Sequence, residues 1–358
     1  MTVSASAARI RHCRVALVAG LSLAVAACAP SVIDSGPDTA QPKIEQLTLL
    51  AADGAALPMQ RWLPAGSLRN GRGPRIVIVA VHGMNDYANS FHGPGRDWAR
   101  RGIATYAFDQ RGFGRAPGRG LWPGVARMQS DFRAAVAAVR KRHPRARIFG
   151  LGMSMGGGVV LSTMGRADAP KLDGMILVAP AVWSRATMPG LYRVTLSLAA
   201  HTIPWARLSP SAVKRLPTDN LALLKRLSKD RHMLRGARVE ALWGVVNLMD
   251  AAAAAAPRAK VPTLLLYGER DEIVPRKPIQ AVISRLPRAQ TRVALYAEGW
   301  HMLLRDRQAK VVIDDIAAWV RNPRAALPSG ADSRDVVAIL KRKRPKRPAA
   351  IRIRMSGG

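Results

Sequence analysis

The sequence predicts an α/β protein with a mostly parallel central sheet, helices on both faces and an inserted helical cap. Short apolar runs with the length of buried strands alternate with amphipathic segments of helical spacing along most of the chain. Residues 75–81 form a continuous, β-branched apolar run, which is typical of a strand covered on both faces. The alternation stops between Ala181 and Ala259, where helical segments contain no strand candidate. This interruption predicts the cap.

The remaining elements follow in chain order. Residues 46–50 and 57–63, joined by Ala52-Asp53-Gly54, predict an antiparallel hairpin at a sheet edge. Apolar runs predict further strands at 103–108, from Arg147 into Ser154, and at 174–178, 261–267 and 291–296. Helical spacing predicts helices at 97–101, at 128–142, directly after Ser154, from near Pro278, and at 307–319.

The N-terminal residues have the pattern of an export signal. Arg9, Arg11 and Arg14 precede an apolar run over 15–27 that is too short for a comfortable membrane span. The run closes with Val25-Ala26-Ala27-Cys28, which resembles a bacterial lipoprotein signal and implies that Cys28 carries the lipid. Ala29 in place of aspartate resembles lipoproteins of the outer membrane. We therefore expect an exported, lipid-anchored protein at its periplasmic face, with an ordinary secretory signal as the alternative.

Composition divides the chain further. Residues 28–43 are rich in proline, serine and glycine and predict a flexible tether, whereas ten basic and two acidic residues from Asn322 onward predict a disordered basic tail. The expected organisation is a signal peptide over 1–27, the tether over 28–43, core over 44–180, cap over 181–259, core over 260–322 and tail over 323–358.

The formal net charge of the 358-residue chain is +33. So strong a positive charge favours anionic partners, and an exported protein would meet phospholipid or lipopolysaccharide, so we expect no nucleic acid partner. Two alternatives need no anionic partner and stay open. The net charge is also expected of a soluble protein from an arginine-rich proteome, and the basic tail could simply be solvated. The two cysteines, Cys13 and Cys28, exclude a disulfide framework or a cysteine metal site in a chain that loses one of them.

The strand that begins at Arg147 ends at a serine and turns directly into a helix. In Gly152-Met153-Ser154-Met155-Gly156 the two glycines flank Ser154, where side chains would collide across a sharp turn. Such a turn exposes the hydroxyl as a nucleophile. It also leaves the Met155 N–H, at the start of the helix, directed at incoming negative charge.

A serine hydroxyl needs a base to take its proton and a carboxylate to orient that base. In a sheet of this type the carboxylate and then the histidine should follow later in the chain, each after a strand. The segment after residue 267 offers Glu269, Asp271 and Glu272, of which we select Asp271, and His301 follows the strand 291–296.

The loop after residue 81 is expected to complete the site. His82 should organise this loop, and the Met84 N–H should pair with that of Met155 as an oxyanion hole. No His, Cys, Asp or Glu cluster in the sequence has the spacing of a metal site, and no phosphate loop or G-x-G-x-x-G motif follows a strand, so no metal or cofactor is expected.

Several motifs occur together in the same order as in a known family. They are His82-Gly83-Met84, Asp109-Gln110-Arg111-Gly112-Phe113-Gly114, the Ser154 pentapeptide, residues 268–275 and His301. Together they resemble the monoacylglycerol lipase and lysophospholipase group of α/β-hydrolases, relatives of the S33 serine aminopeptidases, from about Gln46 to Trp319. The resemblance implies the α/β-hydrolase fold and serine-dependent hydrolysis of single-chain lipid esters. Arg115-Ala116 departs from the family pattern in a structural loop.

Two other functions remain open. An aminopeptidase or amidase of the same fold would need acidic residues in the cap to bind a free α-ammonium group, but residues 181–259 contain twelve Lys and Arg against four Asp and Glu. A non-catalytic envelope lipoprotein is the third candidate, although three separated triad residues argue against it. The headgroup, the acyl chain and the oligomeric state stay undetermined.

Overall fold

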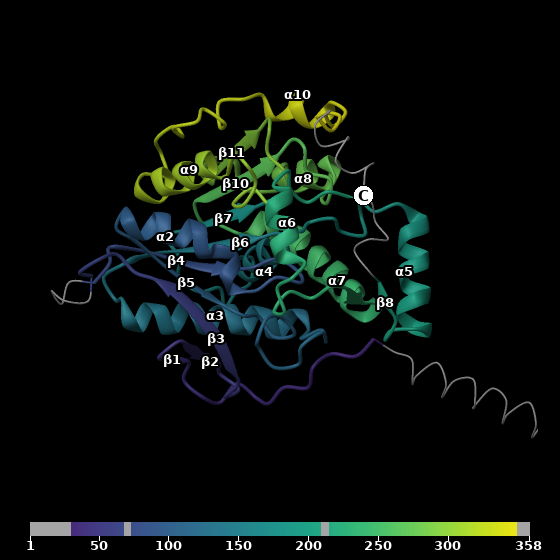
Figure 1. The fold of residues 1–358 in the computed structure, drawn as a ribbon, viewed down its shortest axis with the longest axis horizontal. Helices are drawn as coiled ribbons and strands as arrows, with labels where there is room; N and C mark the ends of the chain where they lie inside the picture. Colours follow the sequence, from purple (N-terminus) through teal and green to yellow (C-terminus); the bar gives the residue numbers. More distant parts are fainter. Residues whose placement is uncertain (1–29, 68–72, 209–214, 349–358) are drawn as a thin grey trace, which may run out of the picture.

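The structure is a computed structural model that describes residues 30–67, 73–208 and 215–348. The expected signal peptide, Cys28 and the last ten residues of the expected tail lie outside these ranges. Figure 1 presents the central feature, one twisted sheet covered by helices.

In the described part of the chain, this sheet has nine strands in the order β1-β2-β3-β5-β4-β6-β7-β10-β11. Its strands are β1 (Lys43–Glu45), β2 (Thr48–Leu50), β3 (Ala56–Trp62), β4 (Ile76–Val81), β5 (Ile103–Phe108), β6 (Arg147–Met153), β7 (Gly174–Val178), β10 (Thr263–Gly268) and β11 (Thr291–Tyr296). The three N-terminal strands pair antiparallel and join β5 antiparallel, whereas all pairs from β5 to β11 are parallel. The mostly parallel sheet is as predicted.

Both faces of the sheet are buried, which explains the continuous apolar runs. Along β4, Val77 and Val79 contribute to one core cluster, whereas Ile78 and Ala80 contribute to the other. Helices α3 (Val125–Arg142), α4 (Met155–Met164), α7 (Val239–Ala255) and α8 (Arg276–Ile283) pack on the first face. The short helix η1 (Ala88–Phe91) and helices α2 (His92–Arg100) and α9 (Ala309–Arg321) pack on the second.

The cap is smaller than the sequence predicts. It holds α5 (Gly190–Thr202), which stands apart from the sheet at the right of Figure 1, and α6 (Leu221–Leu227), which lies near α7 in that view. The sequence pattern places helix α7 in the cap, but Leu248 and Ala252 lie in the core cluster and the helix packs on α4. With the turn that follows it, the helical segment Val239–Arg258 is long and apolar enough to span a membrane, a test that the buried core helix of a soluble protein also passes. The cap also contains one strand pair that was not expected, β8 (Arg207–Leu208) with β9 (Ala237–Arg238).

The expected flexible tether is wrong for its described part, residues 30–43. Ser31 Oγ donates to Glu240 Oε2 at 2.9 Å, and the Ile33 N–H donates to the Trp122 carbonyl at 2.7 Å. Asp38 pairs with Arg127 and accepts a hydrogen bond from Ser130. The segment therefore runs along the domain surface, held by specific partners that its composition does not reveal.

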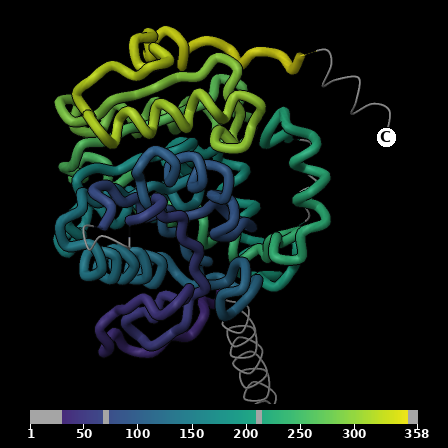
Figure 2. Tube along the Cα trace, turned by 60° about the vertical axis from the view of Figure 1, so that its left-hand side comes forward, coloured from purple at the N-terminus to yellow at the C-terminus, as the bar shows by residue number. Residues whose placement is uncertain are grey.

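The expected disordered tail is also wrong for residues 323–348. Leu327 and Ala331 are buried in the cluster around α9, and helix α10 (Val336–Lys341) buries Ile339 and Leu340 near α8. Figure 2 shows this last segment across the β11 end of the sheet, far from the β1–β2 hairpin. A few apolar residues spaced among the basic ones give the segment enough buried surface to fold onto the core.

Candidate active site

Ser154 lies at the sharp turn between β6 and α4. Its φ of +53° lies in the left-handed region, which a non-glycine residue rarely adopts and which marks local strain. A Cβ on Gly152 would lie 2.2 Å from the Gly156 oxygen, and a Cβ on Gly156 would lie 2.1 Å from the Val81 oxygen. Glycine is therefore required on both sides of the serine for the turn to close.

The structure brings the three predicted triad side chains together. His301 Nε2 lies 2.9 Å from Ser154 Oγ, and His301 Nδ1 lies 2.8 Å from Asp271 Oδ2. Asp271 and His301 are buried, and Asp271 Oδ1 accepts the N–H groups of Ile273 and Val274 at 2.7 and 3.0 Å. Nδ1–H therefore donates to the carboxylate, which leaves Nε2 free to accept the serine proton.

The two neighbouring carboxylates are occupied elsewhere. Glu269 pairs with Arg334 at 2.5 Å and Arg276 at 3.7 Å. Glu272 pairs with Arg347 at 2.5 Å. Of the three acidic residues in this turn, Asp271 is the one that contacts the imidazole.

His82 organises the loop after β4, as predicted. It is fully buried, Nδ1 donates to the Gly83 carbonyl at 2.8 Å, and Nε2 accepts the Gln110 N–H at 2.9 Å. Burial lowers the pKa of His82, which favours this neutral tautomer. In a second hydrogen bond between the two residues, Gln110 Nε2 donates to the His82 carbonyl at 2.8 Å. The sequence motif contained Gln110, but the sequence alone did not assign it this role.

The two candidate oxyanion donors lie on either side of the serine. A Cβ on Gly83 would lie 3.3 Å from Ser154 Cβ, so the loop that carries Met84 passes directly beside the nucleophile. Within the described chain the Met84 N–H has no acceptor, and Met155 begins α4, so its N–H has no partner inside the helix. Both amides are available to a ligand oxygen.

Comparison with known proteins identifies the family of this chain. Residues 72–308 match the family described as "Serine aminopeptidase, S33". The chain belongs to this family. Its members share the α/β-hydrolase fold, which accounts for the order of the sheet and for the position of the serine turn.

Similar proteins in this family include lipases. A monoacylglycerol lipase of Mycolicibacterium smegmatis is 29% identical over 69% of this chain and 88% of that protein. The monoglyceride lipase of Rattus norvegicus is 25% identical over 76% of this chain and 89% of its own length.

Solved structures support the same fold. The crystal structure of a Paleococcus ferrophilus monoacylglycerol lipase has a TM-score of 0.60 at 21% identity, covering 74% of this chain and 98% of that one. A soluble variant of the Saccharomyces cerevisiae monoglyceride lipase, in complex with a substrate analog, has a TM-score of 0.64 at 20% identity and covers 82% and 97%. At these identities the likeness establishes the fold.

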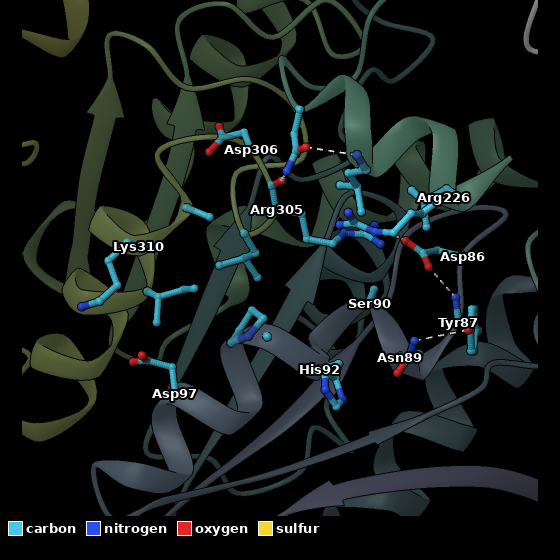
Figure 3. Close-up of a pocket in the computed structure, with 18 of the residues that line it drawn as sticks. Asp86, Tyr87, Asn89, Ser90, His92, Asp97, Arg226, Arg305, Asp306 and Lys310 are labelled. Carbon is cyan, nitrogen blue, oxygen red and sulfur yellow. Dashed lines mark hydrogen bonds and ion pairs between the residues drawn. The ribbon is translucent and has the colours of Figure 1, made fainter. Parts of the chain in front are cut away.

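A cavity of about 630 Å³ lies between the cap helix α6 and the core elements η1, α2 and α9 (Figure 3). Its walls include the residues that follow His301 along the chain, among them Arg305, which forms an ion pair with Asp86. The triad side chains do not line this cavity. It therefore lies next to the loop that carries the imidazole and is separate from the nucleophile.

Asp306, on the wall of this cavity, is a residue that the sequence reasoning missed. Its carboxylate accepts the N–H of Trp300 at 3.1 Å and that of Gln308 at 3.1 Å, so it holds the backbone directly before His301. Burial raises the pKa of Asp306 to about 7. An acidic residue five positions after the candidate base is the signal that could have pointed to it.

Among the described residues, no group of three His, Cys, Asp or Glu side chains is placed to hold a metal ion. The groups around Ser154 are the His301 imidazole, the Asp271 carboxylate and the backbone amides of Met84 and Met155.

Proposed function

We propose that this protein is a serine hydrolase that cleaves carboxylic esters of single-chain lipids, such as monoacylglycerol or lysophospholipid. The observation that carries the proposal is the continuous chain of contacts from Asp271 through His301 to Ser154 at a strained strand-to-helix turn. Turns of this kind present a serine to substrate, and the imidazole stands within reach of its proton.

The mechanism follows from these positions. His301 Nε2 takes the proton of Ser154 while Oγ attacks the ester carbonyl, and Asp271 stabilises the imidazolium that forms. The N–H groups of Met84 and Met155 stabilise the oxyanion of the tetrahedral intermediate, with each such donor worth about 3 to 4 kcal/mol in comparable sites. The alcohol leaves with the proton from His301. Water then attacks the acyl-enzyme by the same steps and releases the fatty acid.

Two observations favour a lipid substrate. The similar proteins named above are monoacylglycerol and monoglyceride lipases. In addition, cap helix α5 exposes apolar side chains, with Leu191 71% and Leu198 65% exposed. An apolar helix that remains accessible suits contact with a lipid surface, from which single-chain esters would be taken.

The membrane association belongs to the same proposal. Acylation at Cys28 would anchor the protein, with about 0.8 kcal/mol for each buried methylene, and would place it in the cell envelope. Metabolic labelling with a radioactive fatty acid tests this step, because Cys28→Ser should abolish the label and the membrane association together. A Cys28→Ser protein that remains labelled would contradict the anchor.

Direct assays distinguish the hydrolase from its alternatives. Ser154→Ala should abolish hydrolysis of a short p-nitrophenyl ester and of monoacylglycerol, whereas Ser162→Ala should retain both. Ser162 is a matched control because it lies in the same helix α4 and bonds only to the Val159 carbonyl there, at 3.1 Å. Retained hydrolysis in Ser154→Ala would contradict the proposed nucleophile.

A substrate panel with monoacylglycerol, lysophospholipid and an aminoacyl-naphthylamide separates lipase, lysophospholipase and aminopeptidase activity. The family description leaves the peptidase open, and preferential cleavage of the naphthylamide would favour it. A fluorophosphonate probe tests the third candidate, a non-catalytic envelope lipoprotein, because Ser154 would not react with the probe in a protein without an active triad.

A further inference from the structure

The segment over residues 334–347, which we name the C-terminal strap, lies against the turn that carries Asp271. The family match ends at residue 308, so the strap lies outside the part shared with the family. Helix α10 of the strap packs on α8, and Arg276 at the start of α8 donates to the Ile339 carbonyl at 2.6 Å and to the Arg342 carbonyl at 3.0 Å. The strap is thus fixed to the element directly after the turn.

Arginines of the strap bind the two carboxylates on either side of Asp271. Arg334 pairs with Glu269 at 2.5 Å and donates to the Leu295 carbonyl at 2.8 Å. Arg347 donates to both oxygens of Glu272, from Nε at 2.7 Å and from Nη2 at 2.5 Å. This bidentate arrangement fixes orientation as well as charge. Asp271 is left to the imidazole.

The Glu272 side chain is only 3% exposed, so its charge depends on these partners. Burial alone would raise the pKa of Glu272, but the bonds from Arg347 and from the Leu216 N–H outweigh it and lower the pKa. The Leu216 N–H, from the cap, donates at 2.9 Å. Glu272 therefore connects the strap, the catalytic turn and the cap.

We propose that the Arg347–Glu272 ion pair is a positioning device for the reaction, which holds the turn of Asp271 in place and balances the charge beside the Asp271–His301 pair. The inference rests on the proposed function, because it concerns the same triad. In the proposed role, neither Arg347 nor Glu272 touches the substrate. They act through Asp271, whose Oδ1 is held by the backbone of the same turn, at Ile273 and Val274.

Charge provides a test that a purely structural contact would not pass. The groups that face Glu272 are Arg347 and Arg344 of the strap. Arg215, Arg276 and Lys346 line a second cavity, also of about 630 Å³, whose walls include Asp271 and Glu272. Removing the charge of Arg347 leaves excess negative charge near His301, which favours the protonated imidazole. Removing the charge of Glu272 has the opposite effect.

The experiment measures the pH profile of kcat/KM for a soluble ester. In Arg347→Gln the acidic limb should move to higher pH by about half a unit, as expected for a unit charge acting over several ångströms in a partly screened site. In Glu272→Gln the limb should move to lower pH, and the double variant should return close to the wild type. In Arg347→Gln, kcat should fall roughly three- to tenfold with little change in KM, since a displaced orienting group weakens the chemical step.

Two further variants serve as controls. Lys343→Gln removes a charge from the same strap at an exposed position and should leave the profile unchanged. Arg347→Lys keeps the charge but loses the bidentate bond, so the acidic limb should stay in place and kcat should recover in part. Shifts of Arg347→Gln and Glu272→Gln in the same direction, or no shift beyond that of Lys343→Gln, would overturn the proposal.

The rate of fluorophosphonate labelling at Ser154 gives a second readout that needs no natural substrate. Its pH dependence should move with the two variants as kcat/KM does, and the final extent of labelling counts the folded, competent molecules. A wild type that is never labelled would refute the proposed function itself. Labelling with the same pH profile in the wild type, Arg347→Gln and Glu272→Gln would refute the positioning role and leave the proposed function standing.

Discussion

The loop that carries the Met84 N–H should depend on His82, and His82→Phe tests this dependence. Phenylalanine fills much of the same volume but leaves the Gly83 carbonyl and the Gln110 N–H without their partners, bonds of 2.8 and 2.9 Å in the structure. An unsatisfied buried backbone group costs about 1 to 3 kcal/mol, so the free energy of unfolding should fall by roughly 2 to 6 kcal/mol.

The catalytic effect should exceed what lost stability explains. A displaced Met84 amide removes one oxyanion donor, which lowers kcat by about a hundredfold to a thousandfold. Urea unfolding measures the first effect, and kcat per fluorophosphonate-labelled serine measures the second. His143→Phe is the matched control, because His143 is also buried and contacts the Tyr106 hydroxyl at 2.8 Å. It should lose stability and keep its kcat.

The pH dependence of stability gives a further check on His82. Because burial lowers the pKa of His82 in the folded state, the unfolded chain binds a proton at mildly acidic pH that the folded protein does not bind. This contribution to stability is present above the ordinary histidine pKa of about 6.5 and is lost as pH falls. The wild type should therefore lose more stability than His82→Phe between pH 7 and 5. If His82→Phe keeps wild-type kcat and stability, the loop does not depend on this side chain.

Three other substitutions test separate features. Gly156→Ala should abolish fluorophosphonate labelling of Ser154, because its Cβ would lie 2.1 Å from the Val81 oxygen. The control Gly93→Ala, whose Cβ would have no neighbour within 4 Å, should stabilise helix α2 slightly. An active Gly156→Ala would contradict the described turn. Arg111→Met should lower the free energy of unfolding in urea by about 3 to 5 kcal/mol, because buried Asp131 loses its ion pair and buried Asp53 keeps the more distant Arg127, at 3.6 Å. A loss below about 1 kcal/mol would show that the Arg111 ion pairs are dispensable. Because burial raises the pKa of Asp306 to about 7, its stabilising contribution is present at low pH and is lost as pH rises through 7. Between pH 5.5 and 7.5 the wild type should therefore lose about 1 to 2 kcal/mol of stability relative to Asp306→Asn, as measured by thermal unfolding. An equal change in stability in the two proteins would exclude this titration.

The sheet could be predicted from the sequence because its strands are covered on both faces. Strands β5, β7 and β11 have the predicted bounds, since each is a mainly apolar run between polar or glycine-containing segments. The candidate triad could be predicted for a related reason. Ser154 directly follows β6, and Asp271 and His301 lie in the loops that follow β10 and β11, so the order of strands along the chain specifies where the side chains meet.

The ends of the described chain could not be predicted in this way. Composition favours flexibility for residues 30–43 and 323–348, yet the second segment is held by a few buried side chains, and both are held by partners distant in sequence, such as Glu240 for Ser31 and Glu272 for Arg347. Such contacts leave no periodic pattern. The cap boundary failed for a similar reason, because α7 has the same apolar character whether it covers a sheet or a cap.

The Arg347–Glu272 pair also has a consequence for the order in which the protein is made. Arg347 follows Glu272 by 75 residues, so a ribosome has already synthesised Ser154, Asp271 and His301 before the strap exists. A growing chain can assemble the sheet and bring these three side chains together while the turn between them still lacks its last support. Under the proposed positioning role, the protein reaches full hydrolytic activity only once the strap has joined the core.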